Sequence, residues 1–372
     1  MNILFLDQFN ELGGAQQCLL DLVDGMRSGN LHAGLPGDGP LARALRERGV
    51  DVHHLPELSY SHGHKSVKDV FRYGWDALRL VPRLRRIVRA NGIDLVYVNG
   101  PRLLPAASMA AKNLVFHAHS YLDKRYAASM ARWSLRRNKA RALASSEFVA
   151  SALRPSKVRV IYNGVREIPF RPPKPAAIKP WRIGIVGRIA PEKGQVDFVG
   201  AARILQDWGI DAEFRIQGEP LFSGATYANV VRDLSRDLPV TFAGWSNDIA
   251  SIFADLDLLV VASTWVEANP RVIIEAFSAG VPVVSYPAGG IPELIEDGVT
   301  GALTQAATPE SLADSIARML GDPARMNRIA RAARATWEER FTLQRYVREV
   351  LEFLGTAPTG NIGPQLLRAG RL

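Results

Sequence analysis

Cysteine is nearly absent from this chain of 372 residues, in which Cys18 is the only one. An internal disulfide is therefore excluded, and with it the disulfide-stapled secreted domains. No apolar run approaches the roughly 20 residues that a membrane-spanning helix needs. The opening residues, MNILFLDQF, lack the basic segment of a secretory signal and have the composition of a first strand. These absences favour a cytoplasmic protein.

Extremes of composition are lacking as well. Hydrophobic residues make up 47% of the chain and charged residues 22%, which are the proportions of a globular protein. The length allows two domains, each with a core of its own. Cys18 shares a helical spacing with Leu19 and Leu22, so we expect it on the buried face of the first helix.

The net charge of +9 is concentrated in the first half of the chain. Residues 1–170 contain 25 Lys and Arg against 14 Asp and Glu, whereas the remainder contains 21 against 23. The densest basic segment, residues 70–89, combines aromatic side chains with arginines. Such a helix suits an anionic membrane surface, and an ordinary surface helix whose arginines face water fits equally well. A second basic cluster comprises Arg132, Arg136, Arg137, Lys139 and Arg141. Because no helix-turn-helix, zinc-finger or RNA-binding pattern accompanies this charge, we expect no nucleic-acid partner.

Short β-branched runs alternate with helical patterns along the chain. Six strand candidates precede residue 165, and five lie between residues 182 and 286. This alternation predicts an α/β fold with two doubly wound parallel sheets. We predict an N-terminal domain over residues 1–165, a proline-rich linker over 166–181, a second domain over 182–339, a helix at about 340–354 that packs back on the first domain, and a loose tail over 355–372.

The most informative segment is WVEANPRVIIEAFSAGVPVV, in which seven residues separate Glu267 from Glu275. Asn269 followed by Pro270 is typical of a helix start, so we expect Asn269 to cap the free amides there. Those amides attract phosphate, and carboxylates on either side suit sugar hydroxyls. The alternative is an amphipathic helix that carries two solvated glutamates.

Two further strand ends carry residues suited to phosphate. Arg188 and Lys193 follow a predicted strand, and two cations there can neutralise the charge on a departing diphosphate. Gly13 and Gly14 follow the first strand, where the missing Cβ atoms let the backbone approach a ligand. Taken singly, each of these features also fits an ordinary turn.

Five motifs together resemble one known family. They are GGAQ at 13–16, VFHAHS at 115–120, VGRIAPEKG at 186–194, the segment from Glu267 to Glu275, and YPAGGIPELIEDGVTG at 286–301. In this order they are similar to the retaining GT-B glycosyltransferases of family 4, the glycosyl transferases group 1. The similarity runs from Met1 to about Leu354. It implies two Rossmann-like domains that face each other across a cleft.

The resemblance implies roles for the second-domain motifs. Arg188 and Lys193 would contact the donor diphosphate, Glu267 the hydroxyls of the donor sugar, and Glu275 those of the ribose. The phosphate between the two glutamates would be held by the backbone of Asn269, Pro270 and Arg271.

In the first domain, the resemblance places His119 beside the reacting centre. His117 is the rival match, two residues earlier on the same face of the strand. Ser120 stands where the family often has an aspartate.

Three other patterns in the sequence compete with this interpretation. Asp255 and Asp257 form an Asp-x-Asp pattern, but their positions at a helix end and a strand start favour a structural role. A histidine group lacks a carboxylate or thiolate at metal-ligand spacing; it comprises His53, His54, His62 and His64. An acid and base pair of a glycoside hydrolase is disfavoured, because such an enzyme holds no diphosphate. We therefore expect neither a metal nor another cofactor.

The hypothesis is a retaining glycosyltransferase that moves a hexose from a UDP- or GDP-sugar to a saccharide or lipid-linked acceptor of surface polysaccharide or glycolipid synthesis. We expect it in the cytoplasm or peripherally on the inner face of the plasma membrane. The alternative is a non-catalytic partner subunit that binds a nucleotide sugar. One departure from the family is the short segment GMRSGNLHAGLPGDGP, for which we expect a truncated second strand.

Overall fold

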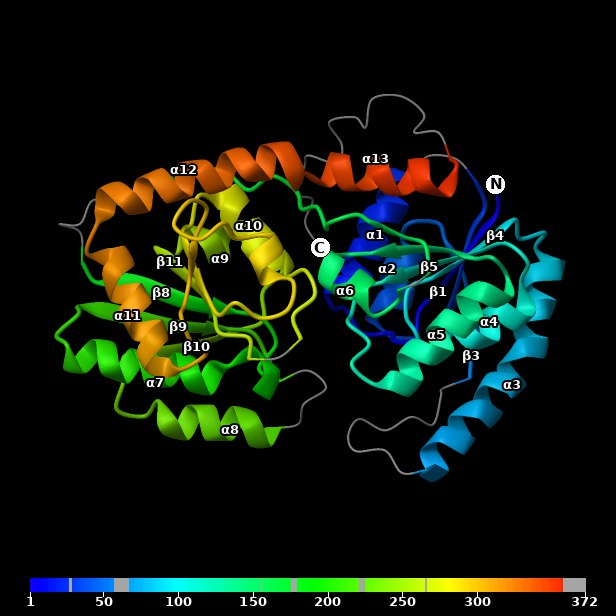
Figure 1. The fold of residues 1–372 in the computed structure, drawn as a ribbon, viewed down its shortest axis with the longest axis horizontal. Coiled ribbons are helices and arrows are strands. Elements are labelled where there is room, and N and C mark those ends of the chain that lie inside the picture. The colour runs from blue at the N-terminus through cyan, green and yellow to red at the C-terminus, as the bar shows by residue number, and fades with distance from the viewer. Residues whose placement is uncertain are drawn as a thin grey trace. The chain divides into compact units, whose positions relative to one another are not determined.

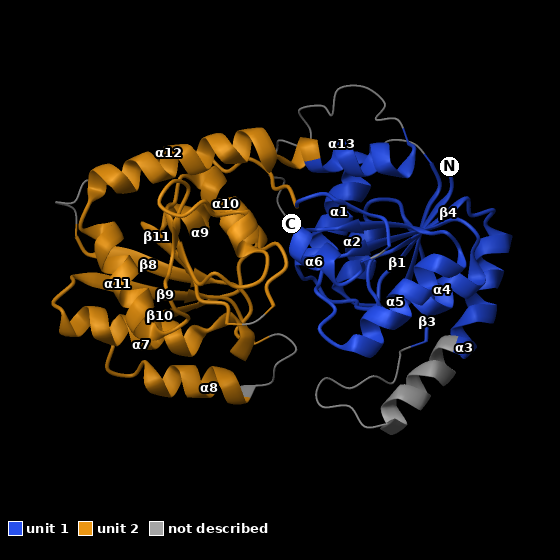
Figure 2. Ribbon diagram, in the orientation of Figure 1, with its two compact units in different colours: residues 1–162, 346–366 blue, residues 163–345, 367–372 orange. Residues whose placement is uncertain are grey.

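The computed structural model describes residues 1–26, 29–56, 67–154, 156–174, 179–220, 225–264 and 266–356, with the side chains of the helix at 67–90 described from residue 78 onward. The chain forms two compact units, each built on one parallel sheet (Figures 1 and 2). The first unit holds residues 1–162 and the described residues from 346 onward, and the second holds residues 163–345.

The first unit contains seven parallel strands in the order β3-β2-β1-β4-β5-β6-β7. The strands are β1 (Ile3–Leu6), β2 (Leu31–Pro36), β3 (Asp51–Leu55), β4 (Leu95–Val98), β5 (Leu114–Ala118), β6 (Arg141–Ala144) and β7 (Val158–Val160). Helices pack on both sides of this sheet (Figure 1). They are α1 (Gly14–Gly25), α2 (Pro40–Arg46), α3 (Val67–Ala90), α4 (Leu104–Ala110), α5 (Arg125–Arg137), α6 (Glu147–Ser151) and the greater part of α13 (Leu343–Leu354).

The second unit contains six parallel strands in the order β10-β9-β8-β11-β12-β13. The strands are β8 (Trp181–Val186), β9 (Ala212–Gln217), β10 (Val240–Gly244), β11 (Leu258–Val261), β12 (Val283–Ser285) and β13 (Ala302–Leu303). The helices are α7 (Gln195–Asp207), α8 (Ala225–Leu234), α9 (Ile249–Ala254), α10 (Arg271–Ala279), α11 (Pro309–Leu320) and α12 (Pro323–Arg340), with the short 3-10 helices η1 (Pro191–Lys193) and η2 (Ile291–Glu293).

The central strands are apolar on both faces, as strands between two helix layers must be. Every residue of β4 and of β11 is buried. In the second unit, the core includes the fully buried rings of Trp181, Phe198 and Phe214. Full burial of such a side chain contributes about 1.5–3 kcal/mol, so these rings hold α7 onto the sheet. Cys18 is completely buried in α1, which confirms its expected position.

The predicted alternation is confirmed, and one strand differs from its prediction. β2, expected to be truncated, is six residues long and pairs with both β1 and β3. The segment is short because the connection between α1 and β2 comprises only residues 26–30. The strand itself is not shortened. β13 was not predicted, since two residues carry no periodicity.

The proline-rich segment 166–181 was expected to be a linker, and its described residues, 166–174 and 179–181, belong to the second unit. Its backbone is held by α10: the Ile168 amide donates to Ser278 Oγ over 2.8 Å, and the Arg171 amide donates to the Ala279 carbonyl over 2.9 Å. Proline therefore removes regular structure from this segment without separating it from the core. The predicted tail at 355–372 lies outside the described residues from 357 onward.

Gly194 lies between η1 and α7 with a φ of 70°, and a Cβ there would approach the Ala262 carbonyl oxygen to 1.9 Å. Gly194→Ala should therefore lower the free energy of unfolding by about 3 kcal/mol or more. Gly209 is a matched control, because its φ is 73° and nothing lies within 4 Å of its Cβ position. Gly209→Ala should cost only about 1 kcal/mol. Urea denaturation measures both, and equal losses would contradict a steric requirement at Gly194.

Candidate functional site

Each sheet reverses its strand order at one point, between β1 and β4 in the first unit and between β8 and β11 in the second. Ligands of open parallel sheets bind at the carboxyl ends of the strands at such points. Polar side chains gather at both points. Asp7 and Asn99 follow β1 and β4, while Arg188 and Ser263 follow β8 and β11.

The centre of the second-unit site is an ion pair between Lys193 and Glu267. Lys193 Nζ lies 2.6 Å from Glu267 Oε2, and the exposed fractions of the two side chains are 28% and 16%. The buried Ser263 donates its hydroxyl to the same Oε2 over 2.9 Å. Glu267 is thus held by two donors, one of them charged, on one carboxylate oxygen.

The environment of Glu267 keeps its carboxyl group ionised. Burial raises the pKa, but the charge and hydrogen bond of Lys193, the Ser263 hydroxyl and the charge of Arg188 outweigh burial and lower the pKa below its usual value. A carboxylate of this kind is a poor proton donor and a good acceptor for hydroxyl groups.

The loops around this pair are fixed by backbone contacts. The Gly290 amide donates to the Glu267 carbonyl oxygen over 2.8 Å. At Gly289, where φ is 57°, a Cβ would lie 2.1 Å from that same oxygen, so only glycine fits. The AGG sequence of the 286–301 motif therefore supports the loop that carries Glu267.

Arg188 also has a carboxylate partner. Its guanidinium pairs with Glu192 on η1, with exposed fractions of 31% and 42%. The side chain of Gln195 fixes the loop between them, because its Nε2 donates to the Arg188 carbonyl over 2.9 Å. The structure therefore brings Arg188, Lys193 and Glu267 together around one loop pair, as expected from the sequence.

Helix α10 begins at Arg271, with Pro270 as its N-cap and without a capping side chain among the described residues. The expected cap by Asn269 is wrong. Asn269 is buried, and its Oδ1 accepts the Asn163 amide over 2.9 Å. Asn163 Nδ2 in turn donates to the Asn269 carbonyl over 2.9 Å, so the side chain of Asn269 ties two backbone segments together instead of covering the helix end.

Glu275 lies in the second turn of α10, where Arg271 Nε is 3.7 Å from its Oε1. Both side chains are 14% exposed. Arg271 also donates from Nη1 to the Gly164 carbonyl over 3.2 Å. Glu275 is therefore partly sheltered and oriented beside the helix start, unlike the solvated glutamate of the alternative interpretation.

The first-unit site is a chain of hydrogen bonds from Asp7 to His119. His119 Nε2 lies 2.9 Å from Asn99 Oδ1. Asn99 Nδ2 donates to Asp7 Oδ2 over 2.7 Å and to the Ala15 carbonyl over 3.2 Å. Because these acceptors fix the orientation of the Asn99 amide, its oxygen must accept from His119, so Nε2 carries a hydrogen.

His117, the rival match, is unsuited to contact a ligand. It is completely buried, and its Nδ1 is hydrogen-bonded to the Tyr97 hydroxyl. Burial, followed by the charge of His119, holds the pKa of His117 well below its usual value. His119 is half-buried at the end of β5, so the geometry favours His119 as the site residue.

The glycines of the GGAQ motif are connected to the same network. Gly13 is the N-cap of α1, and its amide donates to Gln16 Oε1 over 3.2 Å. Gln16 Nε2 donates to both oxygens of Asp7, over 3.1 and 3.0 Å. Gly14, the first residue of α1, is exposed. The motif therefore closes the first βα turn around a buried carboxylate.

The sequence interpretation did not identify Asp7, Asn99 and Ser263. Their common signal is a polar residue within two positions of the end of a buried strand. By contrast, the Asp-x-Asp pair carries structural contacts, as expected: Asp257 pairs with Lys174 over 2.7 Å, and Asp255 with Arg215 over 3.0 Å.

Two family models match the chain. "Glycosyl transferases group 1" matches residues 168–336, and "Glycosyltransferase Family 4" matches residues 40–167. Together the two matches span residues 40–336, and the two doubly wound sheets agree with them. The chain belongs to the GT-B glycosyltransferases of family 4.

Solved structures of this fold agree with the assignment. Anabaena HepE in complex with UDP-glucose is 27% identical, with a TM-score of 0.79 over 95% of this chain and 99% of that one.

Curated relatives match different lengths of the chain. YtcC of Bacillus subtilis is 28% identical over 89% of this chain and 84% of its own length. The match to a galactosyltransferase of Escherichia coli that acts on a GlcNAc-diphosphoundecaprenol is 28% identical and spans 45% of this chain and 46% of the relative. An alpha-D-kanosaminyltransferase of Streptomyces kanamyceticus is 33% identical over 40% of this chain and 38% of its own length. The chain therefore spans less than half the length of some relatives that it matches.

Asp7 allows a pH prediction. Burial raises the pKa of this carboxyl from 3.8 to about 6, against the opposing hydrogen bonds of Asn99, Phe9 and Gln16. Between these values the folded state binds more protons than the unfolded state, so stability falls as pH rises. Asp7→Asn removes this titration. The free energy of unfolding of the variant, relative to the parent, should rise by about 2 kcal/mol between pH values of roughly 4 and 7. Urea denaturation across this range measures the difference, and a constant difference would contradict the raised pKa.

Proposed function

We propose that this family 4 chain transfers a hexose from a UDP- or GDP-sugar to a saccharide or lipid-linked acceptor of surface polysaccharide or glycolipid synthesis, with retention of configuration. The observation that carries the proposal is the Lys193, Glu267 and Ser263 cluster beside the start of α10. It is supported by the UDP-glucose complex of HepE and by the relative from Escherichia coli that acts on a lipid-linked sugar.

The leaving diphosphate is the group that needs the most stabilisation. Arg188 and Lys193 are the cations that would meet it, and preorganised charges of this kind contribute several kcal/mol, or about 100- to 1,000-fold in rate for one group. The uncapped amides at the start of α10, after Asn269 and Pro270, would also attract the negatively charged diphosphate. No metal is required in this proposal.

The carboxylates of Glu267 and Glu275 would bind hydroxyl groups of the donor. Glu267, ionised and held by Ser263, would accept from the hydroxyls of the donor sugar. Glu275, oriented by Arg271, would accept from the ribose hydroxyls. A lowered pKa makes Glu267 unsuited to general-acid catalysis, so the two glutamates do not form the acid and base pair of a hydrolase.

His119 would contact the transferred sugar, with its ring oriented by Asn99 and Asp7. In the proposed step, the acceptor oxygen forms its bond to the sugar on the face from which the diphosphate leaves. The bond between sugar and diphosphate breaks, and the acceptor proton passes to the departing phosphate oxygen. Gly13 and Gly14, at the first βα turn, would let the backbone approach the donor.

Lys193→Ala tests the proposal. Loss of this cation should lower the rate of nucleotide release from the donor sugar by about 100-fold or more, because the leaving group loses its fixed charge. The measurement is single-turnover release of UDP or GDP after a thermal-shift screen has identified the donor. Lys112→Ala, at an exposed lysine of the first unit, is the control and should retain full activity. Unchanged turnover in Lys193→Ala would contradict the site assignment.

The same assay decides between the enzyme and the non-catalytic partner subunit. A binding subunit would be stabilised by a nucleotide sugar and would release no nucleotide with any acceptor. An enzyme releases nucleotide in proportion to the acceptor that it consumes.

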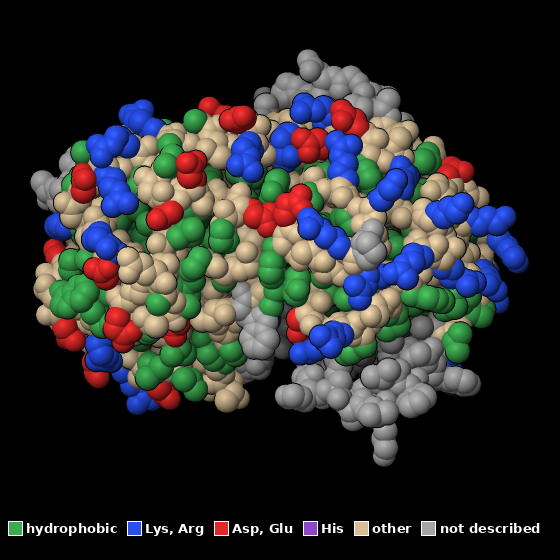
Figure 3. Space-filling model, viewed as in Figure 1, with side chains coloured by type: hydrophobic (Ala, Val, Ile, Leu, Met, Phe, Trp, Pro, Cys, Tyr) green, Lys and Arg blue, Asp and Glu red, His purple; other side chains and the backbone are tan. Residues whose placement is uncertain are grey.

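We also propose contact with an anionic membrane surface. No described helix is both long and apolar enough to cross a membrane. On α3, Leu80, Leu84 and Ile87 are buried, while the exposed side includes a depression lined by Arg85, Arg86 and Arg89. Figure 3 shows Lys and Arg side chains gathered over the first unit, to which α3 belongs. The aromatic residues of segment 70–89 fall among side chains that the structure does not describe.

Helix α5 adds exposed aromatic side chains to this basic surface. Tyr126 and Trp133, seven residues apart, are 39% and 47% exposed, and the Arg137 guanidinium lies 5.8 Å from the centre of the Trp133 ring. Aromatic and basic side chains on one exposed helix face are typical of proteins that bind at the membrane interface.

The membrane proposal predicts binding to vesicles that contain anionic lipid and not to neutral vesicles. Because each basic residue near such a surface contributes about 1 kcal/mol, the Arg86→Ala/Arg89→Ala variant should bind roughly 30-fold more weakly. Flotation with both vesicle types measures this. Arg203→Ala/Arg236→Ala, at exposed arginines of the second unit, is the matched control. Equal recovery of the parent protein with neutral and anionic vesicles would refute the proposal.

A further inference from the structure

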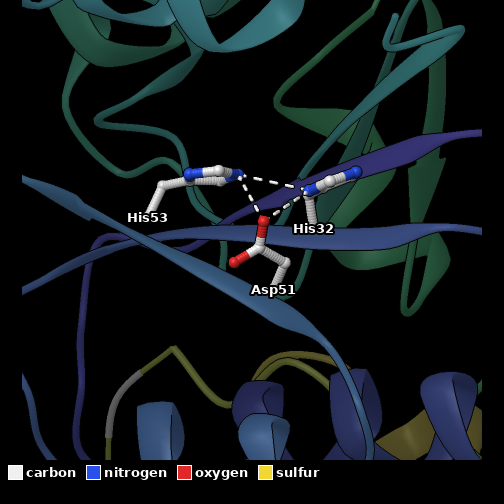
Figure 4. A group of neighbouring side chains, drawn as sticks. All are labelled: His32, Asp51 and His53. Carbon is white, nitrogen blue, oxygen red and sulfur yellow. Dashed lines mark hydrogen bonds and ion pairs between the residues drawn. The ribbon is translucent and has the colours of Figure 1, made fainter. Parts of the chain in front are cut away.

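Three potential metal ligands meet at one end of β2 and β3. His32 Nδ1 lies 3.2 Å from His53 Nε2 and 3.4 Å from Asp51 Oδ2. The third distance, from His53 Nε2 to Asp51 Oδ2, is 3.7 Å. In Figure 4 the two ring nitrogens and the carboxylate oxygen face one another around a single point. These three residues form the only such group of metal-ligand side chains among the described residues.

The sheet itself creates this arrangement. His32 and Asp51 are register partners on the neighbouring strands β2 and β3, and His53 follows Asp51 by two positions. The expectation that no carboxylate lies at metal-ligand spacing from His53 is therefore wrong, because Asp51 does. Side chains two positions apart on a strand lie on the same face, so all three residues project from one face of the sheet. The backbone hydrogen bonds between the strands therefore fix the spacing of the ligands, whatever their sequence separation.

The spacing matches a tetrahedral metal ion. An ion with bonds of about 2.0–2.1 Å to nitrogen and oxygen keeps its ligand atoms roughly 3.3–3.4 Å apart in tetrahedral geometry. The three observed distances of 3.2, 3.4 and 3.7 Å bracket this value. An ion about 2 Å from each atom therefore fits with small side-chain rotations.

We propose that His32, Asp51 and His53 bind a divalent transition-metal ion, best matched by Zn²⁺. Two imidazoles and one carboxylate are ligands that zinc accepts, and this set is too rich in nitrogen for Mg²⁺ or Ca²⁺. Asp51 is 62% exposed and His53 21%, so water reaches the site to complete the coordination.

The site is separate from the proposed transfer chemistry. Asp7, Asn99 and His119 lie at or beyond the carboxyl ends of their strands, whereas His32 and Asp51 lie at the opposite, amino ends of β2 and β3. β3 is the edge strand of the sheet. The ion would therefore fasten the edge strand to its neighbour and stabilise the first unit without taking part in sugar transfer.

Two features oppose binding. Without an ion, His32 and His53 can share a proton across their 3.2 Å contact, with Asp51 as a further acceptor. Arg83, which donates from Nε to the His54 carbonyl over 2.9 Å, adds positive charge near β3, and the Asp51 carboxylate offsets it. The experiment must therefore distinguish a bound ion from a shared proton.

The test uses tag-free, full-length protein stripped with a chelator and titrated with Zn²⁺ by calorimetry, and with Co²⁺ by visible absorption. We expect one ion per chain, the intense visible bands of tetrahedral Co²⁺, and a melting temperature raised by Zn²⁺ and not by Mg²⁺. Nucleotide release should be unchanged by the chelator. Absence of binding, or weak octahedral Co²⁺ bands, would overturn the proposal.

Variants locate the ion. His53→Ala should weaken Zn²⁺ binding by at least roughly 100-fold, because it removes one of three protein ligands. Asp51→Asn, at an exposed position, should weaken binding while leaving the metal-free melting temperature close to that of the parent protein. His54→Ala is the matched control, since His54 points to the Gly37 carbonyl, 3.1 Å from its Nδ1. Equal loss of binding in His54→Ala and His53→Ala would overturn the assignment.

Discussion

The ion pair between Lys193 and Glu267 is the interaction on which the second-unit site depends. Taking a lysine and a glutamate largely out of water costs several kcal/mol for each ion, and only close pairing with further hydrogen bonds offsets that cost. Here Ser263 supplies the additional bond to the carboxylate. The local sequence follows from this requirement: Gly194 lets η1 turn into α7 next to Lys193, and Gly289 lets the following loop pack directly on the Glu267 carbonyl. Removal of Lys193 would leave the largely buried Glu267 carboxylate without its closest charge partner.

The carboxyl groups of Asp7 and Glu267 have pKa values shifted in opposite directions at the two sites. Both are carboxyl groups beyond strand ends at the point where a sheet reverses its order. Glu267 faces a cation, so its pKa is lowered despite burial. Asp7 faces only neutral donors, from Asn99, Gln16 and the backbone, so burial dominates and its pKa rises to about 6. Glu267 is therefore a charged hydrogen-bond acceptor, which the proposed function uses to bind a ligand, whereas Asp7 positions the side chains of Asn99 and Gln16.

The features that sequence could predict are those with local causes. Strand alternation and the helix that begins at Arg271 follow from patterns within short segments. The clustering of Lys193 with Glu267, 74 residues away, was expected only because the motifs resemble a known family. The errors involve distant partners. The cap expected from Asn269 fails because Asn163 takes its oxygen from 106 residues away. The link from Asp7 to Asn99 spans 92 residues, and His32 meets His53 only through the pairing of two strands. Spacing along the chain contains no signal for such contacts.

Under the proposed function, the charge balance of the site implies different roles for Lys193 and Arg188. Lys193 and Arg188 are each paired with a carboxylate, so the four groups together are neutral, and a diphosphate would add negative charge to them. One carboxylate must then move away from its cation. Glu267 is 16% exposed and held by Ser263, whereas Glu192 is 42% exposed on the short η1 helix. Release of Glu192 into water costs less than release of Glu267. Under the proposed function, Arg188 would therefore be the cation that changes partner when a donor binds, and Lys193 would stay paired with Glu267.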